Sequence, residues 1–339
     1  MAATSIEWTE VTWNPVTGCD RISPGCDNCY ALALARRLKA MGQPRYQADG
    51  DPRTSGPGFA VTCHEDVLDQ PTRWRTPRIV FVNSMSDLAH ARVSRSFIAA
   101  AWAVMALTRR HTYQVLTKRP KRLAALLADP GFRLEVAGHA TSLITSRPWQ
   151  RWQLDLGGQR VAGDSGPGHG LTGAHTSGGT AWIPPWPLPN VWAGTTVEDD
   201  ERAWRADALR RAPAAVRFIS AEPLLGPVPS LRLDGIDWCI IGGESGPAAR
   251  PLDLAWVRDL IGRCRGTGTA VFVKQLGTVW ARTHGGGKGT SWNAWPPDLR
   301  ARDYPPGATE PTAAERRGLA GRPASRRTPR ADLVAGGDV

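Results

Sequence analysis

Residues 78–120 read RIVFVNSMSDLAHARVSRSFIAAAWAVMALTRRHTYQVLTKRP, and this stretch decides the fold. Near its two ends lie short apolar runs rich in β-branched residues, Arg78–Asn83 and Thr112–Thr117, which are typical of buried parallel strands. Between them Ser94 precedes an apolar run with helical periodicity, which predicts a capped helix over residues 95–110. The stretch therefore predicts one strand–helix–strand unit of a parallel sheet.

The same alternation continues along the rest of the chain. Further strands are predicted at Val191–Thr195, Val216–Ser220, Trp238–Ile241 and Ala270–Lys274. Amphipathic helices fit between the strands, at residues 120–128, 198–212 and 253–265. No internal sequence repeat accompanies this order. It predicts the α/β class, with parallel strands arranged as a partial or complete TIM-like (β/α) barrel.

Two segments depart from this pattern. Residues 138–189 are rich in Gly, Pro and Trp, and we expect them to form an insertion that is partly disordered or lid-like. Residues 305–339 are rich in Pro, Ala and Arg without periodicity, and we expect a disordered tail. The sequence thus predicts one barrel-like domain over residues 1–304, interrupted once.

Composition and charge limit the function classes. The chain has 339 residues, of which 41% are hydrophobic and 22% charged, which excludes a wholly disordered protein. Its longest apolar run, Ala99–Leu107, is too short to cross a bilayer, and no signal peptide is visible, so we expect a cytoplasmic protein without a membrane partner. The net charge of +11 fits a nucleic-acid or nucleotide partner, although an Arg-rich composition also explains it.

Three of the six cysteines, Cys19, Cys26 and Cys29, follow the spacing C-x6-C-x2-C. Three thiolates on one loop can ligate three irons of a [4Fe–4S] cluster and leave the fourth iron open to a small molecule. An open iron can chelate the amino and carboxylate groups of S-adenosylmethionine, and an electron from the cluster can then break a carbon–sulfur bond. The pattern therefore predicts these three residues as metal ligands, with the cluster and S-adenosylmethionine as cofactors.

A structural zinc ion is the alternative interpretation of the same three cysteines. Zinc needs a fourth ligand, which Cys63 or His64 could supply. The other two cysteines are expected to be core residues, because Cys239 lies in an apolar strand and Cys264 on an apolar helix face.

Polar side chains follow nearly every predicted strand. They include Ser86, Asp87, Lys118, Arg119, Thr195, Thr196, Glu198, Glu222, Glu244 and Lys274. Because the carboxyl ends of parallel strands meet at one edge of a sheet, we expect a shared site there. Lys274 is expected to pair with Glu222 or Glu244, since an unpaired buried lysine is unfavourable.

A set of motifs accompanies the cysteine segment WNPVTGCDRISPGCDNCYA in a fixed order: FVNSMSDL, VLTKRP, VWAGTTVE, ISAEPLLGP and IGGESGP. With these motifs the chain resembles a phage-encoded family named after gene products 37 and 68, a family of unknown function marked by three cysteines. The resemblance spans about residues 5–277, apart from the insertion. That family is in turn similar to radical S-adenosylmethionine proteins, most closely the spore photoproduct lyase-like group. Here the first two cysteines are three residues further apart than in the usual C-x3-C-x2-C spacing of that group.

The resemblance implies roles for individual residues. The three cysteines would hold the cluster, and Ser86 and Asp87 would lie where the amino group of S-adenosylmethionine is received. Lys118 would lie near its carboxylate or the substrate. The residues implied to face the adenosyl part or the substrate are Thr195, Thr196 and Glu222.

We therefore expect a radical S-adenosylmethionine-like iron–sulfur protein that takes an electron from a reductant protein and acts on an unknown substrate, with a nucleic acid or nucleotide as the candidate. The reaction would be reductive cleavage to a 5′-deoxyadenosyl radical, which abstracts hydrogen. Two alternatives remain at this point. One is a zinc-stabilised nucleic-acid-binding protein without catalysis, and the other is a redox or sensing module that carries a cluster without turnover.

Overall fold

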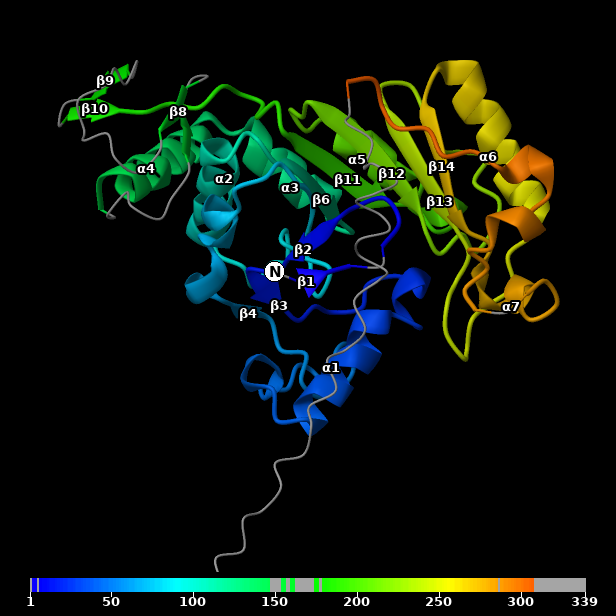
Figure 1. The fold of residues 1–339 in the computed structure, drawn as a ribbon. Helices are drawn as coiled ribbons and strands as arrows, with labels where there is room; N and C mark the ends of the chain where they lie inside the picture. Colours follow the sequence, from blue (N-terminus) through cyan, green and yellow to red (C-terminus); the bar gives the residue numbers. More distant parts are fainter. Residues whose placement is uncertain are drawn as a thin grey trace, which may run out of the picture.

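The fold is built on an eight-stranded sheet that curls into a half-barrel (Figure 1). The computed structural model describes residues 2–4, 6–146, 154–156, 159–161, 174–176, 179–285 and 287–307. Strand β1 is antiparallel to β2, and the seven strands from β2 to β14 in this sheet are parallel to one another. In spatial order the strands are β1 (Ala2–Ala3), β2 (Val11–Trp13), β5 (Ile79–Val82), β6 (Thr112–Thr117), β11 (Val191–Thr196), β12 (Val216–Ala221), β13 (Trp238–Gly242) and β14 (Ala270–Gln275).

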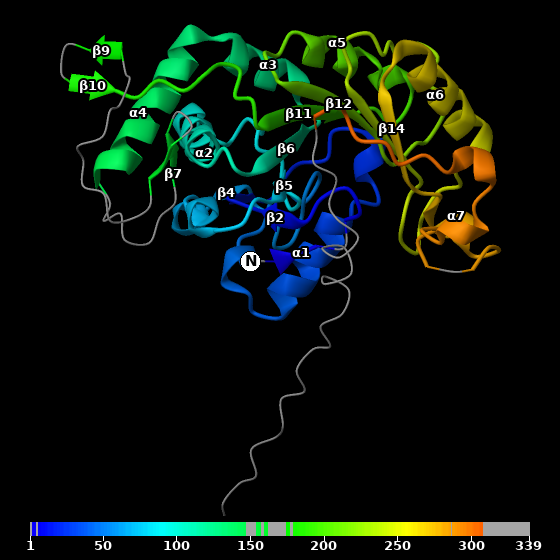
Figure 2. The ribbon, with the colours of Figure 1, turned by 45° about the horizontal axis from the view of Figure 1, so that its top comes forward.

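Helices flank the convex side of this sheet, as Figure 2 shows. They are α2 (Arg95–Leu107), α3 (Pro120–Ala128), α5 (Trp204–Arg210) and α6 (Leu254–Thr267). Helix α4 (Pro130–Ser146) packs against α2. Helices α1 (Tyr30–Ala40) and α7 (Gly277–Ala281) lie beyond the carboxyl ends of the strands, below the sheet in Figure 1. Three short antiparallel pairs complete the described structure: β3 (Val16–Thr17) with β4 (Thr62–Cys63), β7 (Leu154–Leu156) with β8 (Gln159–Val161), and β9 (Ala174–Thr176) with β10 (Gly179–Ala181).

Local signals place several helix ends. The Ser94 hydroxyl accepts a hydrogen bond from the backbone N–H of Phe97 at 3.2 Å, and Asp253 accepts one from that of Ala255 at 2.8 Å. Each bond satisfies an N–H that has no partner within the helix. Gly268 ends α6 with a left-handed backbone (φ 74°), which glycine adopts at little cost.

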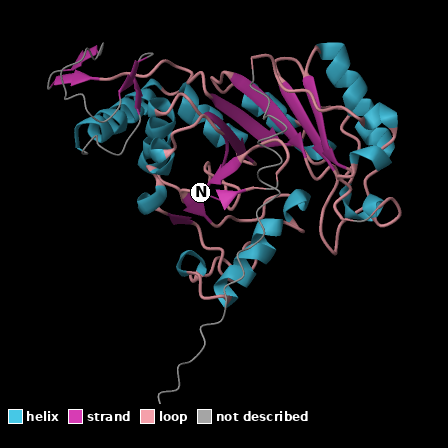
Figure 3. Cartoon of the chain, viewed as in Figure 1, coloured by secondary structure: helices cyan, strands magenta, loops and turns pink. Residues whose placement is uncertain are grey.

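The two faces of the sheet are buried in different ways. Alternate strand residues such as Val80, Val82 and Ile219 pack with the helices on the convex side. On the concave side, aromatic rings form a separate cluster of Trp8, Phe81, Trp192, Phe218, Trp238, Ile240 and Phe272. Figure 3 shows the strands as one curved layer with the helices outside it. The aromatic cluster therefore fills the interior of the half-barrel and leaves its chemistry to the carboxyl ends of the strands.

The predicted fold class is confirmed, and the barrel is a partial one. All six strands predicted along the chain are present within one or two residues of their expected bounds. Helix α4 was not predicted, and it shows that residues 138–146 continue a helix from Pro130. Residues 182–189 are described as well, and Trp182 and Leu188 are buried in the convex core. Most of the central part of the expected insertion, and the expected tail from residue 308, lie outside the described residues.

Candidate functional site

A pocket lies at the carboxyl ends of β5, β6 and β11. Phe81 and Leu116, from the concave face of the sheet, form part of its lining. The lining residues on which the site depends are Cys19, Asp20, Arg21, Cys26, Cys29, Asn83, Ser86, Asp87, Thr117, Lys118 and Thr196.

All three clustered cysteines line this pocket, and they lie in what we call the cysteine loop, residues 18–29. Gly18 has φ 85°, and a Cβ there would lie 2.0 Å from the carbonyl oxygen of Ala60, so only glycine fits before Cys19. The Gly18 N–H donates to the carbonyl of Met85 at 3.0 Å, which places Cys19 beside the end of β5. Cys26 ends a short 3-10 turn, and Cys29 is the N-cap residue of α1.

Burial favours the protonated form of two of these thiols, those of Cys19 and Cys29. Burial raises the pKa of Cys19 to about 12, the Asp87 carboxylate adds to this rise, and the nearby Arg119 guanidinium opposes it. Arg119 also donates to the Cys19 sulfur at 3.5 Å. Burial raises the pKa of Cys29 as well. A metal that binds Cys19 and Cys29 must therefore displace protons from these two thiols.

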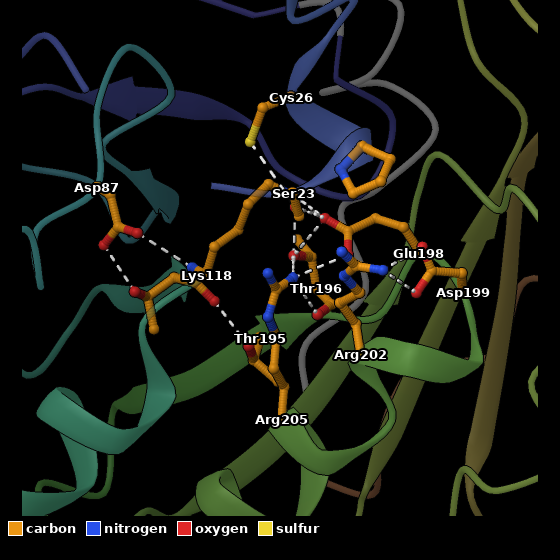
Figure 4. Close-up of polar contacts among 12 residues, drawn as sticks. Ser23, Cys26, Asp87, Lys118, Thr195, Thr196, Glu198, Asp199, Arg202 and Arg205 are labelled. Carbon is orange, nitrogen blue, oxygen red and sulfur yellow. Dashed lines mark hydrogen bonds and ion pairs between the residues drawn. The ribbon is translucent and has the colours of Figure 1, made fainter. Parts of the chain in front are cut away.

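The first carboxylate that holds the cysteine loop is Glu198, just after β11. Figure 4 shows Ser23, Lys118, Thr196 and Arg205 converging on its side chain. Ser23 donates to it at 2.8 Å, Arg205 at 2.8 Å, and Lys118 forms an ion pair with it. Burial would raise the pKa of Glu198, but the charges and hydrogen bonds of Lys118 and Arg205 lower it to about 2. A Cβ on Gly25 would lie 2.4 Å from the Glu198 Cγ, so the loop packs directly on this carboxylate.

The second carboxylate is Glu244, which follows β13. Its Oε2 accepts from Asn28 at 3.0 Å, and Arg250 pairs with its Oε1 at 2.7 Å. Arg250 also donates to the carbonyl of Pro24 at 2.8 Å. Burial would raise the pKa of Glu244, but the hydrogen bonds from Arg250 and Asn28 lower it below its usual value.

The third carboxylate is Asp20, inside the loop itself. It accepts hydrogen bonds from Thr54 at 2.7 Å, Ser55 at 3.1 Å and His90 at 2.9 Å, and pairs with Arg92. Together with Glu198 and Glu244, it ties the cysteine loop to three separate parts of the molecule. The loop is therefore shaped by contacts that exist without a bound metal.

Asp87 and Ser86 line the pocket, but their side chains are already engaged. Asp87 Oδ1 accepts from Ala89 N–H and from Thr117 at 2.6 Å, and its Oδ2 accepts from the Lys118 N–H and from Arg119 at 2.9 Å. Ser86 donates to the carbonyl of Val16 at 2.8 Å. Asp87 thus holds the ends of β5 and β6 and the Arg119 guanidinium together.

The remaining predicted residues separate into two groups. Lys118 and Thr196 line the pocket and contact each other at 2.8 Å. Thr195 lies next to them in the chain, but its hydroxyl donates to the carbonyl of Thr117 at 2.7 Å and does not line the pocket. Glu222 does not line it either, and instead accepts from Lys274 at 2.6 Å, which confirms the expected pairing of Lys274.

A single-ion zinc site is not assembled by the described residues. Among them, no three His, Cys, Asp or Glu side chains lie close enough together to hold one metal ion. Cys63 is exposed, and His64 makes a 2.8 Å hydrogen bond with the hydroxyl of Thr17. Cys239 and Cys264 are buried in the core, as expected.

Sequence reasoning missed Asn83, and it did not find the partners of Arg119 and Glu198. Arg119 and Glu198 stand next to predicted strand ends, so their position in the chain was a usable signal. Their hydrogen-bond partners could not be predicted in this way, because Glu198 bonds to Ser23, which lies 175 positions away in the chain. Asn83 is the last residue of a predicted strand, and nothing in its neighbours shows that its side chain has no partner.

The fold and the pocket define an α/β half-barrel protein with three cysteines at the carboxyl ends of its parallel strands. The chain belongs to the DUF5131 family, described as a protein of unknown function, whose model matches residues 3–325. No curated protein and no solved structure matches this sequence. No helix in the described part of the chain has the length and apolar character that a bilayer crossing requires.

Proposed function

We propose that this protein is a radical S-adenosylmethionine-like iron–sulfur enzyme. The observation that carries the proposal is that Cys19, Cys26 and Cys29 line one pocket at the carboxyl ends of parallel strands. Among the described residues that line it, no other is a cysteine or a histidine. A [4Fe–4S] cluster places each thiolate on a different iron, so it does not need the three sulfurs to converge on one point as zinc does. The donor set therefore fits a cluster with one iron open to a ligand.

When bound, such a cluster would supply one electron, received from a reductant protein, to break the carbon–sulfur bond of S-adenosylmethionine, giving methionine and a 5′-deoxyadenosyl radical that takes a hydrogen atom from the substrate. The chain's own residues have other tasks. Glu198, Glu244 and Asp20 hold the cysteine loop in place before a metal arrives. Phe81 and Leu116 give the pocket an apolar wall that limits water.

The substrate class and the cellular compartment are inferred from composition and from the state of the cysteines. The net charge of +11 supports an anionic substrate such as a nucleic acid or nucleotide. All six cysteines are free thiols, which suits the reducing cytoplasm and protects a thiolate-held cluster. The reductant protein belongs to the proposal because the chain itself offers no second cysteine group for an additional cluster within its described residues.

Anaerobic reconstitution with iron and sulfide tests the proposal. Wild-type protein should become brown, absorb near about 400 nm as iron–sulfur clusters do, and bind close to four irons per chain. Cys26→Ala should lose the colour, whereas the matched control Cys63→Ala should keep it, because Cys63 is exposed and does not line the pocket.

The second part of the test adds S-adenosylmethionine and a strong reductant and measures 5′-deoxyadenosine by chromatography. Its formation by wild type and its absence with Cys26→Ala is the expected result. One tightly bound zinc per chain without iron uptake would replace the proposal by the zinc-stabilised binding protein. A cluster that yields no 5′-deoxyadenosine would leave only a redox or sensing module.

A further inference from the structure

Asn83 is a buried polar residue without a partner at the centre of this site. It directly follows β5, lines the pocket and is 3% exposed. Neither its Nδ2 nor its Oδ1 has a hydrogen-bond partner. Its backbone has φ 63°, the left-handed region that residues other than glycine rarely occupy. Both features are unfavourable in the free protein, and such features concentrate at ligand sites.

The other polar side chains of the lining are committed to the protein. Asp87 and Thr117 bond to each other and to backbone N–H groups, and Thr196 accepts from Lys118 and Arg205. Ser86 donates to a backbone carbonyl. Within the described lining, Asn83 therefore offers an amide whose donor and acceptor are both available to a ligand.

The charges of the lining restrict the chemistry of that ligand. The lining carries two acidic residues, Asp20 and Asp87, and two basic residues, Arg21 and Lys118. Both carboxylates pair with arginines outside the lining, and Lys118 pairs with Glu198. Of these charges, only that of Arg21 has no ion-pair partner among the described residues, so the lining offers one positive charge to a ligand. A single carboxylate beside a hydrogen-bonding amino group fits this charge better than a phosphate group with two negative charges.

We propose that Asn83 binds the α-amino carboxylate group of the pocket's ligand, with Oδ1 accepting from the amino group and Nδ2 donating to the carboxylate. Under the proposed function, on which the identity of the ligand rests, this group is the methionyl end of S-adenosylmethionine. An amino group and a carboxylate that chelate iron keep N–H bonds and lone pairs to share with an amide. Asn83 then takes the role that the family resemblance implies for Ser86 and Asp87, whose side chains bond to other groups of the protein.

The test compares two ligands on the reconstituted protein by anaerobic calorimetry. S-adenosylmethionine carries the amino acid group, and 5′-methylthioadenosine lacks it. Asn83→Gly keeps the left-handed backbone accessible and removes the amide. We expect it to weaken binding of S-adenosylmethionine at least about tenfold, while binding of 5′-methylthioadenosine changes less than about twofold.

Thermal melting without ligand separates this role from a structural one. Asn83→Gly should melt at or above the wild-type Tm, because it removes an unpaired buried amide. The matched control is Asn190→Ala, since the Asn190 amide is also buried but donates to the carbonyls of Met105 and His111. It should melt lower than wild type and bind S-adenosylmethionine unchanged.

Three results would overturn the inference: unchanged binding of S-adenosylmethionine by Asn83→Gly, an equal loss for both ligands, or a cluster-loaded wild type that does not bind S-adenosylmethionine. Failure of the proposed function looks different. Protein that takes up no iron, yet binds S-adenosylmethionine in an Asn83-dependent way, would refute the iron–sulfur enzyme and leave the role of Asn83 standing.

Discussion

Glu198 shows how strongly one side chain can matter in this molecule. Its side chain is fully buried, and two cations, Lys118 and Arg205, depend on it. Removing one member of a buried ion group leaves uncompensated charge, which costs about 3–5 kcal/mol. Glu198→Gln keeps the shape and removes the charge, so the free energy of unfolding should fall by about 3 kcal/mol or more in urea titrations.

The matched control for this change is Glu201→Gln. Glu201 pairs with Arg202, but its side chain is 82% exposed, so the loss should stay below about 0.5 kcal/mol. Similar losses for the two variants would show that the Glu198 cluster does not contribute to stability as its burial indicates.

His64 supplies a pH-dependent contribution to stability. Burial lowers its pKa from the ordinary 6.5, the charge of Arg45 lowers it further, and Asp66 partly opposes both. The unfolded chain therefore takes up a proton at a higher pH than the folded protein. The stability that neutral His64 contributes is fully present above pH 6.5 and is lost as the pH falls toward the folded-state pKa.

Urea titrations at two pH values measure this effect. When the pH falls from 7.5 to 5.5 (values about one unit either side of the ordinary histidine pKa), the free energy of unfolding should fall more in wild type than in His64→Gln. An identical pH dependence in both proteins would mean that other groups carry it.

At the residue scale, local spacing and strand ends were enough to place the three cysteines and Lys118 at one site, and their roles toward a metal and a ligand stay predictions. The sequence could not predict that Asp87 accepts hydrogen bonds from four donors, since three of them come from the next strand and its following turn. Nor could it show that Asn83 lacks a partner. Hydrogen-bond satisfaction depends on groups that meet only after folding.

At the scale of the elements, the packing of β11 on β12 depends on one missing side chain. A Cβ on Gly194 would lie 2.3 Å from the Phe218 ring, which is fully buried in the aromatic cluster. Gly194→Ala must displace that ring, and such overpacking costs about 1–3 kcal/mol. Chemical unfolding followed by tryptophan fluorescence should show this loss.

Helix α6 provides the matched glycine. Nothing lies within 4 Å of a Cβ at Gly262, which is exposed in the middle of that helix. Gly262→Ala should therefore stabilise the protein by up to about 1 kcal/mol through helix propensity. If both substitutions changed the free energy of unfolding in the same direction, crowding at Gly194 would not explain the effect of Gly194→Ala.

The elements themselves were predictable where their pattern was regular. The strands are short, apolar and followed by polar residues, and Ser94 and Asp253 mark helix starts that the structure confirms. Helix α4 was missed because Pro130 and Gly131 begin it and Gly138 lies within it, and these residues are typical of loops. Its packing against α2 overrides that local preference.

At the scale of the whole molecule, the last described residues cover the edge of the sheet. Val273 and Asp303 donate to the carbonyls of Ala301 and Val271 at 2.8 Å, so the segment 301–304 pairs with β14. Tyr304 stacks on Trp238 with ring centroids 5.3 Å apart. This segment therefore shields an edge strand that would otherwise be open to other chains.

Two shortened chains test that role. A chain that ends at Gly307 keeps these contacts, and since the sequence predicts a disordered tail beyond them, its Tm should equal that of the full chain. A chain that ends at Arg300 loses two backbone hydrogen bonds and the Tyr304 stack, about 2 kcal/mol or more. It should melt several degrees lower and associate in light scattering. Equal melting of the two chains would exclude the proposed shielding.

The α/β class of the fold could be predicted, because apolar strand patterns and amphipathic helix patterns alternate along the sequence. The degree of closure of the half-barrel could not, since this depends on how β1 and the segment 301–304 border the sheet. The three carboxylates that hold the cysteine loop were also beyond sequence reasoning. Two of them, Glu198 and Glu244, meet the loop from 175 and 216 positions away.

That separation has a consequence for the order of events during synthesis. The cysteines leave the ribosome among the first thirty residues, yet Glu244 and Arg250 follow more than two hundred residues later. At about 5–20 residues per second, the thiols wait on the order of ten seconds or more before their loop can take its final shape. Under the proposed function, delivery of iron and sulfide would therefore follow translation of most of the chain, and a prematurely terminated product would carry all three thiols without the residues that arrange them.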